Sequence, residues 1–311
     1  MSRWQDIKNN PVLRANLEKR AKLLAAIRAF FDSRGYLEME TPLMVPKPGM
    51  EPFLEPFETE LRTPTGEKRQ AFLITSPEYA LKKLLAAGFE RIYQLGKCFR
   101  NGEGSGGRHN PEFTMLEWYR AGTDYFGLMD ETEDLFTEVG KLFGKTFPKP
   151  FERLTVAEAF QKFAGRDALE LSNDEGEFHK IFLNEIEPKL GVERPTFLYE
   201  YPVSMAALSR PAKNPRFAER FELYINGLEL TNAFSELTDA DEQKRRLEEE
   251  RELRKKFGKT DYAVDDDFIA AVRAMPESAG ISLGVDRLLM VMADAKDIRV
   301  VIAFPTDTMF Q

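Results

Sequence analysis

Residues 91–120, RIYQLGKCFRNGEGSGGRHNPEFTMLEWYR, contain two strand-like segments on either side of a glycine-rich loop. The segments 91–100 and 112–120 are rich in the aromatic and aliphatic residues that favour strands. The loop 101–111 is too short for a crossover helix, so we expect the two strands to be antiparallel neighbours. This hairpin predicts an antiparallel sheet.

On both sides of this hairpin, segments with helical patterns and segments with strand patterns follow one another without a regular β-α alternation. Apolar residues recur with the helical period over 11–34, and Thr155 and Glu158 form a capping box. Ser76-Pro77-Glu78 supplies an N-cap, a first-turn proline and a first-turn acid. We therefore expect an α+β fold, an antiparallel sheet flanked by helices. The expected helices are 11–34, 76–88, 125–143, 155–163, 174–190, 239–257 and one from Asp286, and the other expected strands are 36–40, 70–75, 197–201, 280–285 and 299–304.

Residues 217–234 are expected to form a second hairpin. Asn226-Gly227 is the strongest two-residue turn signal in the chain. A two-residue turn here sets the cross-strand pairs Tyr224 with Glu229 and Leu223 with Leu230.

The same hairpin places two acids on one face. Glu222 and Glu229 become diagonal neighbours, roughly 7 to 8 Å apart at Cα. Oxygen ligands of this kind suit Mg²⁺, which keeps much of its water. Two solvated glutamates on an exposed strand face are the alternative interpretation.

Composition excludes several classes of protein. The 311 residues carry 44 Lys and Arg against 52 Asp and Glu, a net charge of −8, so no chain-wide basic field is present to hold nucleic acid nonspecifically. The single cysteine, Cys98, cannot form an internal disulfide. The first residues lack the apolar core of a signal peptide, and no apolar run is long enough to span a bilayer. We therefore expect a soluble cytoplasmic protein.

The loop also matches the pattern G-x-G-x-x-G at 102–107. A dinucleotide site needs a helix after the glycines, whereas here a strand follows. A flexible loop with Arg100 and Arg108 at its ends is the better interpretation, and it suits closure over a polyphosphate.

Three further features of the sequence could be either structural or functional: Glu117, Cys98 and the run 248–256. Glu117 lies on an aromatic strand face, where a carboxylate is an unusual core residue, and an ion pair with an arginine at the sheet edge is the structural alternative. Cys98 is expected to be a small buried residue and not a nucleophile served by His109. The run 248–256 is expected to be an exposed, salt-bridged helix face.

Four segments carry a resemblance to a known family. TSPEYALKKLLAAGFERIYQLGKCFRN (75–101), RHNPEFTMLEWYRAGTDY (108–125), LELTNAFSELTDADEQ (228–243) and AGISLGVDRLLMVM (279–292) closely resemble the catalytic domain of class II lysyl-tRNA synthetases. Pro42 resembles the family's first signature, Phe99-Arg100 through Glu117 the second, and Gly284 to Arg287 the third. The resemblance implies a class II synthetase-like domain over residues 1–311.

The stretch before Pro42 is too short for the OB-fold that grips the anticodon in those synthetases. The chain, with LEWYR after NPEFTM, therefore resembles the bacterial elongation factor P β-lysine ligases. The resemblance implies ATP-dependent activation of β-lysine or lysine as an adenylate, and its transfer to a lysine side chain of elongation factor P. It also implies a homodimer through the first signature, ATP and Mg²⁺ as cofactors, and no stable binding of tRNA or membranes.

The resemblance assigns roles residue by residue. Arg100 and Arg287 are the implied catalytic residues, and Glu222 and Glu229 the implied Mg²⁺ ligands. The implied ATP-binding residues are Arg100, Asn101, Glu103, Arg108, His109, Asn110, Phe113, Glu229 and Arg287. The implied amino-acid-binding residues are Ser76, Glu78, Glu117, Tyr119, Asn232, Phe234, Glu236, Ser282 and Gly284.

The chain departs from the synthetases in three places. The loop between Asn101 and Arg108 is one residue longer, which leaves the contact of Glu103 with adenine open. Ala233 replaces a glycine. Ser282 also replaces a glycine, and its added side chain is expected to reshape the floor of the substrate pocket.

Rival functions are a truncated lysyl-tRNA synthetase-like enzyme, a small-molecule amino-acid ligase and a catalytically dead binding paralogue. The last is disfavoured because Arg100, Arg287, Glu222 and Glu229 are all present.

Overall fold

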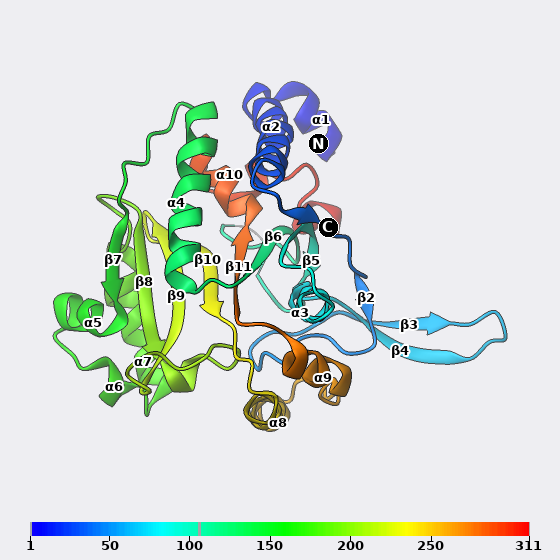
Figure 1. Cartoon of the computed structure of the whole chain (residues 1–311). Coiled ribbons are helices and arrows are strands. Elements are labelled where there is room, and N and C mark those ends of the chain that lie inside the picture. The colour runs from blue at the N-terminus through cyan, green and yellow to red at the C-terminus, as the bar shows by residue number, and fades with distance from the viewer. Residues whose placement is uncertain (1, 105–106, 311) are drawn as a thin grey trace. The chain divides into compact units, whose positions relative to one another are not determined.

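The computed structural model describes residues 2–104 and 107–310, and the chain divides into two compact units (Figure 1). Unit 1 comprises Met1–Glu117, Asp239–Met275 and Gly284–Gln311, and unit 2 comprises Trp118–Thr238 and Pro276–Leu283. The expectation that residues 1–311 act as a single catalytic domain remains a prediction.

Several helices of unit 1 begin where the sequence supplies a side-chain N-cap. The side chain of Asn10 accepts hydrogen bonds from the amides of Val12 and Leu13, and this starts the long second helix. Asp239 caps the charged helix in the same way. The helices are α1 (Arg3–Asn9), α2 (Pro11–Asp32), α3 (Glu78–Ala86), α8 (Ala240–Lys256), α9 (Asp266–Ala274), α10 (Val285–Ala293) and α11 (Thr306–Met309), with a 3₁₀ turn at Ile298–Val300.

The strands of unit 1 form two groups. β1 pairs in parallel with β5, and β4 lies between β2 and β3 in an antiparallel sheet. β6 (Glu112–Ala121) leads from unit 1 into unit 2. The other strands are β1 (Leu37–Glu38), β2 (Met44–Val45), β3 (Glu58–Arg62), β4 (Lys68–Leu73) and β5 (Arg91–Phe99).

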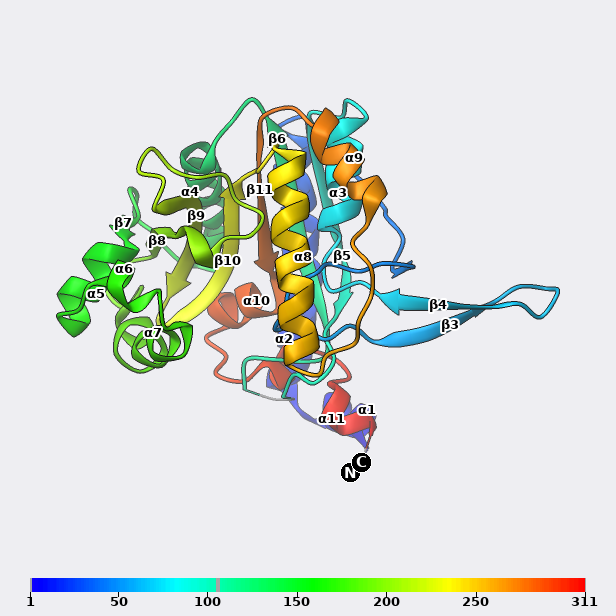
Figure 2. The same cartoon turned by 90° about the horizontal axis from the view of Figure 1, so that it is seen from below.

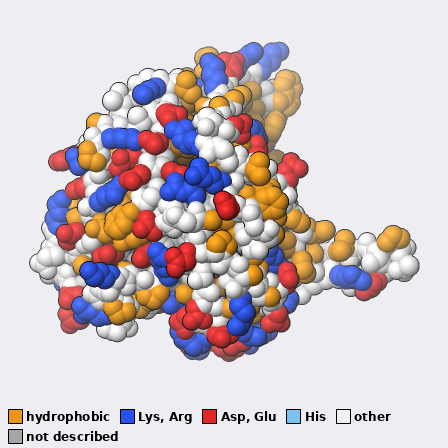
Figure 3. All heavy atoms as spheres, viewed as in Figure 1, with side chains coloured by type: hydrophobic (Ala, Val, Ile, Leu, Met, Phe, Trp, Pro, Cys, Tyr) orange, Lys and Arg blue, Asp and Glu red, His pale blue; other side chains and the backbone are white. Residues whose placement is uncertain are grey.

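β3 and β4 extend away from the other elements of unit 1 as an arm (Figures 1 and 2). Every residue of β3 is exposed. Figure 3 shows charged and apolar side chains together along the arm. The strand predicted as buried over 70–75 is confirmed in its burial except at Gln70, which is exposed, and Leu73, which is half-buried; β4 begins two residues earlier and ends at Leu73.

Unit 2 is built on the strand order β11-β10-β9-β8-β7. All neighbours are antiparallel except β7 and β8, which are parallel. Helix α4 packs on β9 and β10. The elements are α4 (Tyr125–Leu142), β7 (Glu152–Thr155), α5 (Val156–Ala164), α6 (Ala168–Leu171), α7 (Glu175–Ile181), a π-helical turn (Phe182–Ile186), 3₁₀ turns at Glu187–Lys189 and Val203–Met205, β8 (Thr196–Pro202), β9 (Phe217–Ile225), β10 (Leu228–Ser235) and β11 (Ser278–Gly284).

The α+β class is confirmed, with antiparallel pairs predominating. The turn at Asn226-Gly227 is also confirmed, with φ of 52° and 64° at its two residues. The pairing of Leu223 with Leu230 was wrong, because a bulge between Glu229 and Thr231 places Leu223 opposite Thr231.

Two other predicted elements were wrong. The expected strand 299–304 is absent from the described part of the chain, where a 3₁₀ turn at Ile298–Val300 stands instead. The expected helix 174–190 is interrupted: α7 ends at Ile181, and a π-helical turn and a 3₁₀ turn follow. Pro188 accounts for the interruption near the end, because its ring cannot be accommodated in a helix interior.

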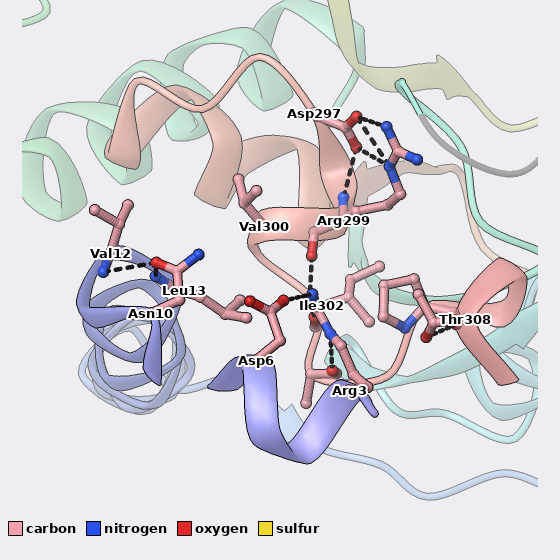
Figure 4. A network of polar contacts seen from close by, with 12 residues as sticks. Arg3, Asp6, Asn10, Val12, Leu13, Asp297, Arg299, Val300, Ile302 and Thr308 are labelled. Atoms are coloured by element: carbon pink, nitrogen blue, oxygen red, sulfur yellow. Dashed lines mark hydrogen bonds and ion pairs between the residues drawn. The ribbon is translucent and has the colours of Figure 1, made fainter. Parts of the chain in front are cut away.

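Helix α1 is bonded to the segment that follows α10 (Figure 4). Arg3 donates hydrogen bonds to the carbonyl oxygens of Arg299, Ile302 and Ala303 at 2.6, 2.9 and 2.8 Å. Asp6 pairs with the same guanidinium at 2.8 Å (Figure 4). Arg3 therefore fixes the segment that follows α10. Among the described residues, none of the helices combines the length and the apolar character that crossing a membrane requires.

Candidate functional site

Arg100 lies at the end of β5, where the glycine-rich loop begins. Its amide donates to the carbonyl oxygen of Pro111 at 2.9 Å, so the two ends of the loop are tied together. Its guanidinium carbon lies 5.1 Å from the ring centroid of Phe113, within cation–π range. Its Nε is buried with no protein acceptor. Arg100 is therefore held against an aromatic ring, and its Nε–H group has no acceptor among the described residues.

Arg287 lies in the first turn of α10. Its Nη2 is 2.7 Å from Nε2 of His109, and its Nε donates to the carbonyl oxygen of Arg108 at 3.3 Å. Because a guanidinium only donates, His109 must accept through Nε2 and be neutral. Burial and the positive charge of Arg287 accordingly lower the pKa of His109.

The other loop residues differ in their surroundings. Glu103 lies 3.9 Å from the guanidinium of Arg100, and Arg108 is exposed. Asn110 is buried with both ends of its amide occupied: Nδ2 donates to the carbonyl oxygen of Glu112 and Oδ1 accepts from the amide of Thr306. Asn110 is therefore a support of the loop. Asn101 uses its side-chain oxygen to accept from the amide of Gly102, and Ser105 and Gly106 lie outside the described residues.

A second group of unit 1 gathers at the start of α3. The hydroxyl of Ser76 donates to Glu117 Oε1 at 2.5 Å and accepts from the amide of Glu78 at 3.0 Å. Lys82, one turn later, pairs with Glu78 at 2.5 Å, and both residues are buried. The predicted N-cap at Ser76 was wrong by one residue, because α3 begins at Glu78 with Pro77 at the N-cap position and no side-chain cap. Ser76 instead links the amide of Glu78 to the carboxylate of Glu117.

Glu222 is the centre of a polar network in unit 2. The hydroxyls of Tyr201 and Tyr224 each donate to Oε2 at 2.5 Å, and Arg220 donates to Oε1 at 2.5 Å. Burial raises the pKa of both tyrosines, so they remain donors. Glu229 lies opposite Tyr224 and so shares the face of Glu222, as predicted.

Strand β10 carries two of the expected substrate residues on its more exposed face. Asn232 and Phe234 are half-buried, whereas Ala233 between them is fully buried. Asn232 lies opposite Ser282 on β11, whose hydroxyl donates to the carbonyl oxygen of Asn232 at 3.3 Å. Arg220 also donates to the side chain of Asn232, at 3.1 Å.

Tyr119 and Glu236 meet over Gly280. A Cβ on Gly280 would lie 2.2 Å from Cε1 of Tyr119 and 2.4 Å from Oε1 of Glu236, so only glycine fits. Sequence reasoning missed Gly280, although a glycine inside a strand is a signal of close approach. Gly284, the N-cap of α10, lies in ordinary contact with the side chain of Arg287.

Two interpretations of individual residues have clear outcomes. Cys98 is buried, as expected, and burial raises the pKa of its thiol, which excludes a reactive thiolate. The exposed interpretation of 248–256 was wrong for four residues, because Glu250, Arg251 and Leu253 are half-buried and Arg254 is buried. Arg254 is 1% exposed and donates to the carbonyl oxygens of Glu51 and Leu54 at 2.8 and 2.5 Å.

Comparison with known proteins places the chain among synthetases and ligases. Residues 1–308 match the family model described as tRNA synthetases class II (D, K and N). A protein of Proteus mirabilis named elongation factor P–(R)-β-lysine ligase is 42% identical, over 94% of this chain and 95% of its own length. A protein of the same name from Haemophilus influenzae strain PittGG is 40% identical over 99% and 98%. A third, from Pectobacterium atrosepticum, is 40% identical over 94% and 95%.

Proposed function

The chain belongs to the class II tRNA synthetases of the D, K and N group, and on this basis we propose that it is an elongation factor P–(R)-β-lysine ligase. It activates (R)-β-lysine, or lysine, with ATP and joins the activated amino acid to a lysine side chain of elongation factor P. The observation that carries the proposal is the similarity to proteins of that name over almost the full length of both chains.

The arginines of unit 1 support the ATP-dependent half of the reaction. Arg100 binds the α-phosphate, Phe113 and Arg287 hold adenine between them, and Arg287 also reaches the polyphosphate. Arg100 rests on Phe113, and Arg287 is bonded to a neutral His109, so both guanidiniums are oriented before ATP arrives. Preorganised donors of this kind stabilise the charge that develops on the phosphoryl oxygens.

The first step needs no general base. The substrate carboxylate attacks the α-phosphorus, the bond to the bridging oxygen breaks, and pyrophosphate leaves with the electron pair. In the second step the amine of the acceptor lysine attacks the carbonyl carbon of the adenylate, AMP leaves, and the attacking amine loses a proton. Alignment and charge neutralisation account for the catalysis of the first step.

The acids of unit 2 suit the implied Mg²⁺. Glu222 and Glu229 share a strand face, and their ligand atoms are the hard oxygens that this ion prefers. Three hydrogen bonds occupy the carboxylate of Glu222, which has about four lone-pair sites, so one site remains for a metal. These two residues would hold the ion. Bound there, it would neutralise phosphate charge.

The diamino acid is dicationic, and the remaining expected residues offer acidic and polar groups for it. These residues, taken over from the resemblance, are Ser76, Glu78, Glu117, Tyr119, Asn232, Phe234, Glu236, Ser282 and Gly284. Buried carboxylates favour a cationic ligand over water because the low dielectric strengthens the attraction.

Pyrophosphate exchange with (R)-β-lysine and with α-lysine tests activation, and mass spectrometry of elongation factor P tests transfer. We expect exchange with the β isomer and a mass increase of one lysyl group on elongation factor P. Bulk tRNA is the control acceptor. Exchange accompanied by loading of tRNA alone would favour the synthetase-like alternative, and exchange without either acceptor would favour a small-molecule ligase.

We also propose a cytoplasmic, twofold-symmetric homodimer that uses α2 and the segment before Pro42. Leu37 on β1 is 55% exposed, which a partner subunit would cover. Light scattering at micromolar concentration should give about twice the chain mass. A monomer with full activity would contradict this proposal.

A further inference from the structure

Arg220 lies on β9 beside three residues of the expected site, although no role was expected for it. The pairing of β9 with β10 sets Glu222 opposite Asn232 and Arg220 opposite Phe234. Residues opposite each other share a face of the sheet, so these four side chains lie on one face, with Arg220 diagonal to Asn232.

The guanidinium of Arg220 donates through all three of its nitrogens. Nε donates to Oδ1 of Asn232 at 3.1 Å, Nη1 to the carbonyl oxygen of Met205 at 2.7 Å, and Nη2 to Oε1 of Glu222 at 2.5 Å. The ring centroid of Tyr201 lies 4.3 Å from the guanidinium carbon. The side chain is 17% exposed. One fixed guanidinium therefore links an expected Mg²⁺ ligand to an expected amino-acid-binding residue.

Strand β8, on the other side of β9, is irregular at this point. The register of β8 against β9 shifts between Tyr199 and Tyr201, and Glu200 between them has a φ of 59°. This left-handed conformation is uncommon for a glutamate. Backbone strain of this kind persists where surrounding contacts impose it, and it is concentrated at functional sites. Here it accompanies the placement of the Tyr201 ring against Arg220.

The bond from Arg220 decides which way the side-chain amide of Asn232 faces. A guanidinium has no acceptor, so the atom of Asn232 beside Nε must be the oxygen. Nδ2, which carries the two N–H donors, therefore points away from Arg220. In the described part of the chain it has no acceptor within hydrogen-bond distance. Asn232 is half-buried, so part of the residue is accessible to a ligand.

An amide fixed in this way binds an acceptor on its ligand. The two ammonium groups of a diamino acid only donate, so the carboxylate is the acceptor that it offers. Without the bond from Arg220 the amide would be free to turn over and present its oxygen, which repels a carboxylate. The carboxylate is also the nucleophile of the first step, so its alignment affects the rate.

We propose that Arg220 is a positioning residue that keeps the N–H donors of Asn232 directed at the substrate carboxylate. This inference rests on the proposed function, in which Asn232 binds the amino acid, and adds to it a residue that acts without touching the substrate. The structural alternative is that Arg220 serves only to neutralise Glu222.

The test compares (R)-β-lysine with 1,4-diaminopentane, which keeps both ammonium groups but lacks the carboxylate. In the absence of ATP, wild-type protein should be stabilised against heat more by β-lysine than by the diamine. Arg220→Lys keeps the charge beside Glu222 but loses the planar fork. It should weaken the binding of β-lysine by about ten- to a hundredfold, the range for a hydrogen bond to a charged group, and leave stabilisation by the diamine unchanged.

Asn232→Asp tests the same idea with Arg220 intact. Aspartate still offers Arg220 an oxygen but presents no N–H donor. It should therefore remove the difference between the two compounds. The double variant Arg220→Lys/Asn232→Asp should bind β-lysine no more weakly than Asn232→Asp alone, because Arg220 acts through Asn232. Losses that multiply in the double variant would show that Arg220 acts independently, and would overturn the proposal.

Arg210→Lys is the matched control, because Arg210 is also half-buried in unit 2 and pairs with Glu219 at 2.7 Å and Glu277 at 3.7 Å, neither of which belongs to the expected site. It should leave the difference between the compounds unchanged. An unchanged difference in Arg220→Lys would show that charge beside Glu222 is sufficient, and equal losses with both compounds would show a general structural role. Either result overturns the proposal. If Arg220→Lys does not fold, a retained difference in Asn232→Asp overturns it instead.

Pyrophosphate exchange separates this inference from the proposed function. Arg220→Lys should lower kcat/KM for β-lysine by about ten- to a hundredfold with little change in the KM for ATP. If wild type shows the difference in stabilisation and Arg220→Lys removes it, but no exchange occurs, the proposed function fails and the role of Arg220 stands. If exchange occurs but Arg220→Lys keeps the difference, the role of Arg220 fails and the function stands.

Discussion

Arg20 of α2 and Asp286 of α10 form an ion pair at 2.5 Å, and the side chain of Asp286 is only 3% exposed. The other oxygen of Asp286 accepts from the amide of Thr114 at 2.7 Å, and Arg20 also donates to the hydroxyl of Thr114 at 2.7 Å. Thr114 follows Phe113 and Asp286 precedes Arg287. One carboxylate therefore fixes the backbone beside both residues expected to enclose adenine.

Replacing Asp286 with Asn should weaken both folding and ATP binding. Removing one partner of a buried ion pair leaves the other charge uncompensated, so the free energy of unfolding should fall by about 2 to 4 kcal/mol. The KM for ATP should rise, because Phe113 and Arg287 lose a shared anchor. Denaturant unfolding and ATP titration measure the two effects. Glu18→Gln, which removes an exposed pair with Arg14 on the same helix, should change stability by less than about 1 kcal/mol.

Replacing Arg100 or Arg287 with Ala should lower pyrophosphate exchange by about a hundredfold or more, the scale for losing one preorganised donor. Arg273→Ala is the control, since that side chain is 65% exposed and pairs with Asp241 on the surface of unit 1. Unchanged exchange in either test variant would remove that arginine from the proposed ATP site.

The stability of the protein should depend on pH through Glu250. Burial and the charges of Glu51 and Glu78 raise its pKa from 4.5 to about 8, against the opposing effect of Arg246 and Arg254. Between these two values the folded state keeps a proton that the unfolded state has lost, so this contribution to stability is full below pH 4.5 and is lost as the pH rises through 8.

Glu250→Gln should therefore flatten the fall of stability with pH and leave the variant more stable than wild type above pH 8. Unfolding by urea at several pH values measures this. Glu249→Gln, at an exposed position of the same helix, is the control. Parallel profiles for wild type and Glu250→Gln would show that Glu250 titrates normally.

Ser282→Gly should alter the choice between lysine isomers. The Ser282 hydroxyl is bonded to the carbonyl oxygen of Asn232, which fixes its side chain on the strand floor where the tRNA synthetases carry glycine. Its removal should shift the ratio of kcat/KM toward α-lysine by roughly ten- to a hundredfold, the scale of one methylene-sized contact, without changing the KM for ATP. If wild type already prefers α-lysine, Ser282 is not the discriminating residue.

The sequence correctly predicted those turns and helix ends whose formation depends on residues close together in the chain. Asn226-Gly227 sets its own turn, and the Thr155 capping box starts α5. The bulge after Glu229 was not predictable, because it depends on how β10 fits between two partners. Residues 299–304 have the composition of a strand, yet Arg3 binds their carbonyl oxygens, which in a strand would bond to a neighbouring strand.

Some residues of unit 1 could likewise be expected from nearby sequence, whereas the surroundings of others depend on distant parts of the chain. Arg100, Glu117 and Arg287 lie in segments whose patterns carried the resemblance, so their positions could be expected. The buried carboxylate oxygen of Glu51 could not be expected, because a glutamate in a loop is ordinarily solvated. Arg254 and Tyr262, more than two hundred residues away along the chain, hold the backbone carbonyl oxygens of Glu51 and Gly49.

The hydrogen bonds made by the segment after α10 determine when, during translation, residues 107–110 can adopt their structure. The amide of Ile298 binds the carbonyl oxygen of Gly107, and the amide of Thr306 binds Asn110 across 196 positions of sequence. Residues 107–110 are therefore synthesised long before the groups that order them. A ribosome that stops short of this segment releases a polypeptide whose loop has lost those two anchors, even though His109 and Arg287 are both present.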